Sequence, residues 1–316
     1  MYSLIVVDYN SIDATLDYIH RCREALGDEG AAHVVLVQNG QDVVHELTER
    51  YGKPTPCTFP TVSQTVYRFD AHGQDVCYCH SGENMGYARG NNLGVRIAQA
   101  VWGDFGYIIS NNDLVFPQGL DLSVATRLFE SNSAIGIIGP AVTTPDGVNQ
   151  SPQAWASPFR RLIVDYWKRF IAAFLKGDKK TRYLLKHCND VVADAPDGEC
   201  AWVSGCFFLA RGEAFHKAGM FDENTFLYGE EMILSRRMER AGYCVWYSSA
   251  LKVIHNHAQT TKKSVSIIAG RELDFRAVWY YYKNYTNTSP LLLTLARWNF
   301  AFYKAVFNLF QKIKGE

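Results

Sequence analysis

Short apolar segments separated by a helical pattern are the feature that most limits how this chain can fold. Residues 3–8 (SLIVVD) and 32–37 (AHVVLV) are continuous apolar runs, each followed by polar turn residues. Between them, apolar residues at helical spacing predict an amphipathic helix over residues 12–26. A strand, a helix and a second strand in this order predict a parallel pair with a right-handed crossover, buried on both faces. The expected fold class is therefore α/β.

Residues 107–116 (YIISNNDLVF) contain the first candidate for chemistry. The segment is typical of a buried strand that ends in a polar turn at Asn111, Asn112 and Asp113. Ligands of open α/β sheets lie beyond the carboxyl ends of the strands, so the Asp113 carboxylate is expected to face a cleft. Its oxygens suit Mg²⁺ or Mn²⁺, which share their coordination shell with substrate phosphates. An ordinary turn is the alternative, because Asn and Asp are common turn residues.

Glycine and asparagine cluster in residues 83–94 (ENMGYARGNNLG), ahead of a helix expected over residues 95–100. Glycines at a helix entrance let the backbone approach a ligand, and helix N-termini attract anions. A glycine-rich turn with helix caps is the structural alternative.

Two adjacent carboxylates, Glu230 and Glu231, precede a helix expected over residues 232–241. The helix dipole favours acids at this position, which gives them a structural interpretation. That interpretation leaves unexplained the aromatic residues before them in the segment FDENTFLYGEE. Further along, His255 follows a strand expected at residues 252–254 and is a candidate metal ligand, with His257 behind it.

The rest of the chain contains four further segments with the character of strands. Strands are expected over residues 76–79, 134–138, 201–210 and 243–247, and three prolines predict an irregular surface excursion before the first of these.

The composition excludes several classes of protein. The 316 residues include 32 basic and 32 acidic side chains, so nothing indicates a nucleic-acid partner. The eight cysteines show no metal-binding spacing, and the N-terminus enters a strand without a basic leader, so a reduced, cytoplasmic setting is expected. The longest apolar region, residues 291–310, is interrupted by polar side chains and is a poor membrane span.

Four motifs resemble those of the family 2 glycosyltransferases, in particular the bacterial rhamnosyltransferase-like branch. In order they are residues 8–10 (DYN), residues 84–94 (NMGYARGNNLG), residues 111–113 (NND) in place of the DxD motif, and residues 205–236 with the FDExxFxYxEE pattern. The resemblance implies a GT-A fold, which has a Rossmann-like, mostly parallel sheet flanked by helices.

The resemblance also implies a division of the chain. A GT-A domain is expected at residues 1–285, with a nucleotide-sugar half at about residues 1–140 and an acceptor half at about residues 141–285. A C-terminal helical extension is expected at residues 286–316.

The activity that the resemblance implies is an inverting sugar transfer in the synthesis of bacterial surface polysaccharide such as O-antigen or capsule. The donor would be a UDP- or dTDP-linked sugar, and the acceptor a hydroxyl of a glycan or lipid-linked glycan. Mn²⁺ or Mg²⁺ would neutralise the leaving diphosphate, and a carboxylate would take the proton of the hydroxyl. The resemblance implies Glu231 as the base, with Glu230 as second choice. The residues expected to bind the donor are Asp8, Asn10, Asn39, Arg89, Asn91, Asn112 and Asp113. Asp113 and His255 are expected to bind the metal, and Trp202, Asp222 and Tyr228 to bind the acceptor.

The chain departs from the family pattern at two notable positions. Gln38 stands where the family often has an acid that contacts the nucleotide base, and Ile233 replaces an Asp that often follows the acidic pair. Two other classes of protein stay open. A sugar-phosphate nucleotidyltransferase would have a glycine-rich, basic N-terminal loop, which residues 8–17 do not provide. A non-catalytic glycan-binding or scaffold protein could keep the fold without the chemistry.

Residues 291–313 predict an amphipathic helix. Its polar side has Arg297, Lys304, Asn308 and Gln311, and its apolar side has Leu295, Trp298, Phe302, Val306, Leu309 and Ile313, widened by Phe300, Phe307 and Phe310. In one interpretation the helix packs against the core of the enzyme or against a second subunit of a homodimer. In the other it lies in the membrane interface, with cations near anionic headgroups, and the protein is peripheral on the inner face of the cell membrane.

Overall fold

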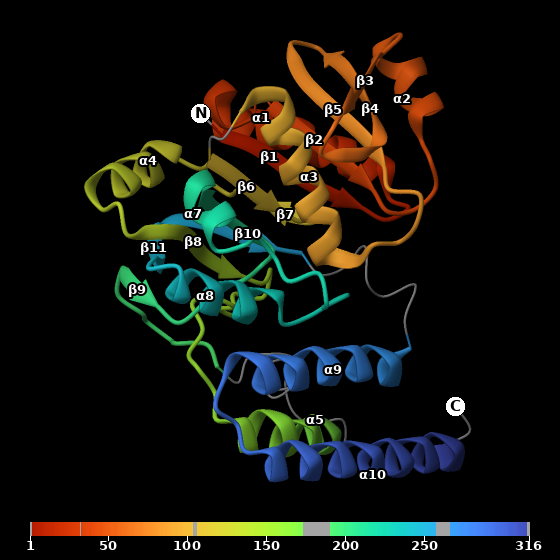
Figure 1. The fold of residues 1–316 in the computed structure, drawn as a ribbon, viewed down its shortest axis with the longest axis vertical. Helices are drawn as coiled ribbons and strands as arrows, with labels where there is room; N and C mark the ends of the chain where they lie inside the picture. Colours follow the sequence, from red (N-terminus) through yellow and green to blue (C-terminus); the bar gives the residue numbers. More distant parts are fainter. Residues whose placement is uncertain (1, 32, 104–105, 173–189, 257–265, 315–316) are drawn as a thin grey trace.

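The computed structural model describes the chain except for residues 1, 32, 104–105, 173–189, 257–265 and 315–316. Its centre is one eleven-stranded sheet with the order β3-β4-β5-β2-β1-β6-β10-β8-β11-β7, and β9 pairs with β11. Helices cover the sheet, and a further group of helices lies beside it (Figure 1).

Four parallel strands form the middle of the sheet, as the apolar runs predict. They are β1 (Tyr2–Asp8), β2 (His33–Gln38), β5 (Gln74–His80) and β6 (Gly106–Ser110). Asp8 lies opposite Gln38, and Gln38 lies opposite His80. The polar carboxyl ends of these strands therefore meet at one edge of the sheet.

The hairpin beside β5 corrects the expectation of an irregular excursion. Residues 55–71 form β3 (Thr55–Phe59) and β4 (Val62–Ala71), and β4 pairs antiparallel with β5. Pro56 lies in β3, which is an edge strand, so its missing N–H removes no ladder bond from the sheet interior. The hairpin was not predicted because prolines occur in edge strands as well as in loops.

The other side of the sheet is mixed in direction. Its strands are β7 (Leu114–Val115), β8 (Ile135–Thr143), β9 (Gly198–Cys200), β10 (Phe207–Arg211) and β11 (Cys244–His255). β10 starts later than expected, and the two strands expected near the end of the sheet are one. A register shift between Ser248 and Lys252 interrupts the polar and apolar alternation of β11 and explains why it looked like two strands.

Six helices flank the sheet in two sets. One core contains residues of α1 (Ile12–Ala31), α2 (Val44–Tyr51) and α4 (Leu122–Ser131), and the other contains residues of α3 (Gly86–Trp102), α7 (Gly212–Lys217) and α8 (Glu230–Arg240). Leu4 and Val6 belong to the first core and Ile5 to the second, so β1 is buried on both faces as predicted. α3 begins nine residues earlier than expected, and most of the glycine-rich motif is inside it.

A third core lies in a layer of helices formed by η1 (Arg160–Val164), α5 (Asp165–Ala172), α9 (Ile267–Tyr285) and α10 (Pro290–Lys314). Figure 1 shows α9, α5 and α10 running side by side at one end of the molecule. Aromatic rings dominate this core: Phe275 and Phe300 stack with their centroids 4.1 Å apart. Ile233 of α8 is fully buried here, so the departure from the family pattern at this position serves packing.

α10 has two apolar faces where one was expected. Leu293, Ala296, Phe300, Tyr303 and Phe307 are buried against the helical layer. Most of the predicted apolar side is instead exposed: Leu295, Trp298, Phe302, Leu309 and Ile313, with Trp298 75% exposed. In the described part of the chain, no helix has the length and apolar content to cross a bilayer.

Candidate active site

Asp8 ends β1, and its carboxylate accepts hydrogen bonds from α1 and from residues at or after the ends of β1, β2 and β6. Thr15 Oγ1 and Gln38 Nε2 each donate to it at 2.6 Å, Asn112 Nδ2 donates at 3.3 Å, and the Ser11 amide donates at 3.1 Å. The side chain is completely buried. Gln38 stands where the family resemblance predicts an acid. The structure explains why residue 38 is a glutamine: its side-chain amide donates to Asp8, whereas an acid at this position would place a second carboxylate against Asp8.

Asn10 and Asn39 lie at the neighbouring ends of β1 and β2. Asn10 has a left-handed φ of 56°, and its Oδ1 accepts a hydrogen bond from the Gln41 amide at 2.8 Å. Asn39 is buried and donates to the Gly86 carbonyl at 3.0 Å. Its Oδ1 has no hydrogen-bond partner among the residues that the structure describes. This buried acceptor is free for a ligand, and the donor-binding role of both residues stays a prediction.

Arg89 and Asn91 are both in α3. Arg89 pairs with Glu83 at 2.9 Å and is partly exposed. Asn91 is buried and donates to the Tyr87 carbonyl at 3.0 Å, while its Oδ1 lacks a partner in the described part of the chain. Their proposed contacts with phosphates or donor sugar also stay predictions.

The glycines of α3 pack closely against other residues of the chain, whereas the motif predicts a close approach to a ligand. A Cβ at Gly86 would lie 2.2 Å from the Phe226 carbonyl oxygen, and one at Gly94 would lie 2.4 Å from the Ile5 side chain. The Tyr87 amide donates to the same Phe226 carbonyl at 2.9 Å. The motif therefore holds the segment before α8 against the sheet.

Asp113 and His255 face each other across the short pairing of β7 with β11, in which His255 lies opposite the residue after Asp113. Asp113 Oδ1 lies 3.2 Å from His255 Nε2, and His255 Nδ1 lies 3.0 Å from Gln150 Oε1. Burial lowers the pKa of His255, but Cys206 and Asp113 outweigh it and raise that pKa to about 10. His257 lies outside the described residues.

This pair fits a divalent ion that shares its coordination with a ligand. A bound ion would displace the proton that His255 Nε2 shares with Asp113 Oδ1, and these two atoms would then serve as two protein ligands, with waters and phosphates completing the shell of Mg²⁺ or Mn²⁺. Among the described residues no group of three or more acidic, histidine or cysteine side chains is placed to hold a metal. An ion held by this pair would therefore take several of its ligands from water or from a bound ligand.

Glu230 and Glu231 lie in the first turn of α8. Burial, and then the charge of Glu231, raise the pKa of Glu230 well above its usual range, and burial raises the pKa of Glu231. The Gly205 amide donates to Glu231 Oε1 at 3.2 Å, and a Cβ at Gly205 would lie 2.5 Å from that oxygen. Only glycine at position 205 leaves room for the carboxylate.

Residues 205 and 206 connect the two acidic centres. Gly205 contacts Glu231, and Cys206, the next residue, contacts His255. The Cys206 carbonyl also accepts a hydrogen bond from the Asn111 amide at 2.8 Å, which ties this segment to the turn that contains Asp113. The structure thus brings together Glu231, Asp113 and His255, which are far apart in the sequence.

The three predicted acceptor residues have different surroundings. Tyr228 has a left-handed φ of 77° and is 38% exposed, so it is available to a ligand. Trp202 Nε1 donates to the Ala154 carbonyl at 3.3 Å. Asp222 is buried and accepts from Tyr280 at 2.9 Å and Tyr285 at 2.5 Å, so it ties the segment before α8 to α9. Their acceptor role stays a prediction.

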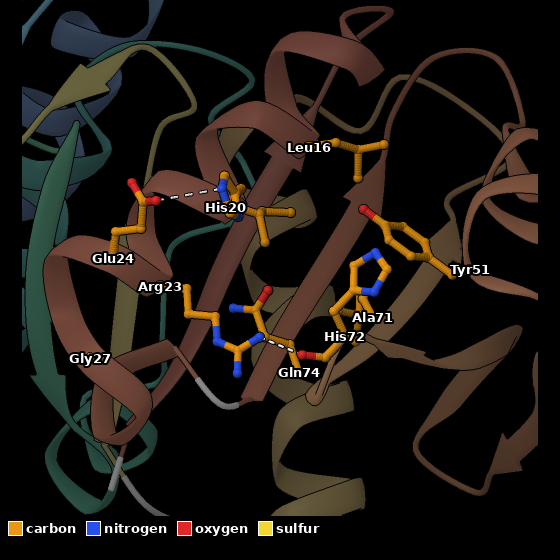
Figure 2. Close-up of a pocket in the computed structure, with 11 residues that line it drawn as sticks. Leu16, His20, Arg23, Glu24, Gly27, Tyr51, Ala71, His72 and Gln74 are labelled. Carbon is orange, nitrogen blue, oxygen red and sulfur yellow. Dashed lines mark hydrogen bonds and ion pairs between the residues drawn. The ribbon is translucent and has the colours of Figure 1, made fainter.

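A cavity of about 530 Å³ lies at the other end of the parallel strands. Figure 2 shows it between α1 and the turn from β4 to β5, lined by His20, Arg23, Tyr51, His72 and Gln74. Gln74 is at the amino end of β5, whereas Asp8 is at the carboxyl end of β1, two strands away. This cavity is therefore separate from the candidate active site.

The relatives found by comparison with known proteins are glycosyltransferases. No family model matches the chain. The chain is 28% identical over 196 residues to N-acetylglucosaminyl-diphospho-decaprenol L-rhamnosyltransferase of Mycobacterium tuberculosis, in a match that covers 57% of this chain and 59% of that relative. It is 26% identical over 243 residues to the low-salt glycan biosynthesis hexosyltransferase Agl10 of Haloferax volcanii, which covers 76% of this chain and 71% of that relative.

Among solved structures, GalNAc-T7 with UDP, GalNAc and Mn²⁺ matches with a TM-score of 0.54 and 12% identity, over 90% of this chain and 48% of that chain. At this identity the similarity shows the fold alone. The α/β class and the GT-A fold with C-terminal helices are confirmed. The resemblance to rhamnosyltransferase-like glycosyltransferases is confirmed by the sequence relatives.

Proposed function

Starting from the GT-A fold and the similarity to rhamnosyltransferases, we propose that this protein is an inverting, metal-dependent glycosyltransferase. The donor is a UDP- or dTDP-linked sugar, and the acceptor is a hydroxyl of a glycan or lipid-linked glycan of a bacterial surface polysaccharide. The observation that carries the proposal is the convergence of Glu231 with the Asp113–His255 pair on either side of residues 205 and 206.

Each part of the site has a task in this reaction. Asp113 and His255 would hold Mn²⁺ or Mg²⁺, and the chemistry that this ion would supply is positive charge beside the leaving diphosphate. Glu231 accepts the proton of the attacking hydroxyl, and its raised pKa brings its proton affinity nearer to that task at neutral pH. A direct attack by that hydroxyl inverts the anomeric carbon. Asn39 and Asn91 each offer to the donor a buried amide oxygen that has no partner among the described residues.

The first test measures release of the nucleoside diphosphate from UDP- and dTDP-sugars with and without acceptor and Mn²⁺. Release that needs both acceptor and metal supports transfer. Asp113→Asn is expected to abolish the metal-dependent activity and leave the fold intact, because it removes the charge of the metal carboxylate. Full turnover by a folded Asp113→Asn protein would contradict the metal assignment. Formation of nucleotide-sugar from a nucleoside triphosphate would instead support the nucleotidyltransferase alternative.

We propose further that α10 holds the protein at an anionic membrane surface. Its 25 residues include no acidic side chain, and although Lys304 pairs with Glu272, Arg297, Lys312 and Lys314 give the helix a positive charge that complements anionic headgroups. Leu295 and Trp298 are more than half exposed, next to a buried face that anchors the helix to the protein. A lipid-linked acceptor would be reached from this surface.

The membrane proposal is tested with Leu295→Ser and Trp298→Ser combined, which leaves the buried face of α10 unchanged. Sedimentation with phosphatidylglycerol vesicles is expected to fall relative to the unaltered protein, and phosphatidylcholine vesicles serve as the neutral control. If both proteins sediment equally, the exposed face has another purpose. A change in oligomeric state of the double variant would identify that purpose as a homodimer contact.

A further inference from the structure

Arginines of the helical layer gather around one buried carboxylate, that of Asp274 on α9. Arg169 Nη1 lies 2.7 Å from Asp274, and Arg161 Nη2 lies 3.7 Å from it. Arg271 is three residues earlier on the same helix. Burial opposes ionisation of Asp274, but Arg169 and Arg161 lower its pKa, so the carboxylate is charged. We call Arg161, Arg169 and Arg271 the arginine cluster.

The arginine cluster has more positive charge than the nearby aspartates neutralise. Asp165 of α5 lies 3.9 Å from Arg161 and 3.8 Å from Lys168, and neither of its buried oxygens has a hydrogen-bond partner among the described residues, while Glu272 of α9 pairs with Arg276 and Lys304. Arg161, Arg169, Arg271 and Lys168 thus face Asp165 and Asp274, and Arg161 also faces Glu231, which still leaves more cations than carboxylates. The mutual repulsion is visible at Arg271, where burial and then the charge of Arg169 lower the pKa to about 10. Arg271 still remains charged at neutral pH.

The arginine cluster also has hydrogen-bond donors to spare. Arg161 Nε, Arg169 Nε and Arg271 Nη1 are all buried and have no acceptor among the residues that the structure describes. Buried donors without acceptors are unfavourable, and charged ones more so. The excess charge and the unpaired donors point to the same missing partner, which is an anion with several oxygens.

The position of the arginine cluster relates it to the acceptor side of the site. Arg161 acts electrostatically on Glu231, and Arg169 acts on Tyr228. The Tyr228 hydroxyl lies close to Gly270, the residue before Arg271. On its other side, the Arg271 guanidinium lies over the Phe307 ring of α10 at 5.0 Å. The cluster therefore lies between the glutamate pair and the helix with the exposed apolar face.

We propose that the arginine cluster binds a phosphate or diphosphate group attached to the acceptor. Guanidinium groups bind phosphate oxygens through paired, charge-assisted hydrogen bonds. A phosphate bound here would place the attached sugar toward Glu231 and the remainder of the acceptor toward α10. The inference rests on the proposed sugar transfer and adds to it a recognition site that selects phosphorylated acceptors.

The test measures binding of inorganic pyrophosphate by calorimetry, in EDTA and in the Asp113→Asn background, so that the metal site does not contribute. Arg271→Gln is expected to weaken binding roughly tenfold or more, the scale of a lost charged hydrogen bond. Arg276→Gln is the matched control, because Arg276 lies on the same helix with its side chain 72% exposed. Arg271→Lys keeps the charge but lacks the planar guanidinium, so its pyrophosphate affinity is expected to lie between those of Arg271→Gln and Arg276→Gln. Equal pyrophosphate binding by the Gln variant and the control would overturn the proposal.

A second arm separates the two sources of such a phosphate. Phosphatidylcholine vesicles that contain a polyprenyl phosphate are compared with vesicles that contain phosphatidylglycerol. Loss of binding by Arg271→Gln to the polyprenyl phosphate vesicles but not to the phosphatidylglycerol vesicles, together with the loss of pyrophosphate binding, supports a lipid-linked acceptor. Loss of pyrophosphate binding with vesicle binding unchanged supports a soluble phosphorylated one. Neither arm needs catalysis. A protein that binds pyrophosphate through Arg271 but transfers no sugar would refute the proposed function and leave the anion site in place.

Discussion

Asp8 and Glu230 are buried and Glu231 is partly exposed beside the same candidate site, yet the surroundings of Asp8 and of the glutamate pair are opposite. Asp8 accepts hydrogen bonds from Thr15 and Gln38 at 2.6 Å each, with further donors around it. Glu231 receives a 3.2 Å bond from the Gly205 amide, and Glu230 Oε1 has no partner in the described part of the chain. Burial raises the pKa of both glutamates.

This difference separates two uses of a buried carboxylate. A carboxylate surrounded by donors fixes the elements that supply them, because each donor would be left unpaired without it. A desolvated carboxylate with few donors holds a proton more tightly and is costly to keep charged. Asp8 therefore has the surroundings of an organising residue at the ends of β1, β2 and β6, and the glutamates have those of a proton acceptor.

The largest effect expected from this comparison is on turnover. Glu231→Gln should lower kcat by about 10²-fold or more, the usual scale for losing general-base assistance, with donor binding little changed. Glu239→Gln is the control, because Glu239 is on the same helix with its side chain 42% exposed. Steady-state rates and donor affinity measured for both variants check this. Greater damage from Glu230→Gln would transfer the role of base to that residue.

The second effect is on stability, and it tests the organising role. Asp8→Asn should lower the free energy of unfolding by roughly 1–3 kcal/mol, because an amide group presents donors to the Gln38 and Ser11 donors. Urea unfolding measures this, with Asp13→Asn as an exposed control in the next helix. If Asp8→Asn leaves stability unchanged but weakens donor binding, Asp8 belongs with the ligand contacts, and the contrast with the glutamates fails.

The sequence predicted the parallel centre of the sheet and the position of two candidate site residues at its edge. Parallel strands buried on both faces leave continuous apolar runs, and the polar ends of β1 and β6 correctly located Asp8 and Asp113 at one edge. It could not predict α9. That helix packs between α8 and α10, so Asp274, Phe275 and Tyr281 are buried without a clear polar face opposite them, and the amphipathic pattern is weak.

The contacts that complete the site were also beyond prediction from the sequence. Gly205 makes room for Glu231, Gln150 orients His255, and Thr15 bonds Asp8, and each of these pairs joins elements whose approach only the folded sheet determines. Gly205 had one sequence signal, its place at the start of the fourth motif. Nothing in the pattern distinguishes Gln150 or Thr15 from ordinary polar residues.

The third effect tests how closely Glu231 must be placed. Gly205→Ala inserts a methyl group where a Cβ would lie 2.5 Å from Glu231 Oε1, so the carboxylate must move. We expect kcat to fall about tenfold or more, because small displacements of a reacting group are costly in rate. Donor affinity should change little. A normal kcat in a folded Gly205→Ala protein would show that the Gly205 contact does not set the position of the base.

The smallest effect is a pH dependence of stability. The pKa of Glu230 is raised on folding from a usual value of 4.5, so the folded state keeps its proton to higher pH than the unfolded state does. The stability that this gives is complete below about pH 4.5 and is lost as the pH rises through the folded pKa. Glu230→Gln cannot ionise and should therefore gain in Tm relative to the unaltered protein as the pH increases, with little difference near pH 4.5. Thermal unfolding from pH 4.5 to 8 checks the slope. A Tm difference between the two proteins that stays constant across this pH range would mean that folded Glu230 is stabilised as a carboxylate, as Asp8 is. Only Glu231 would then differ from Asp8 in its surroundings.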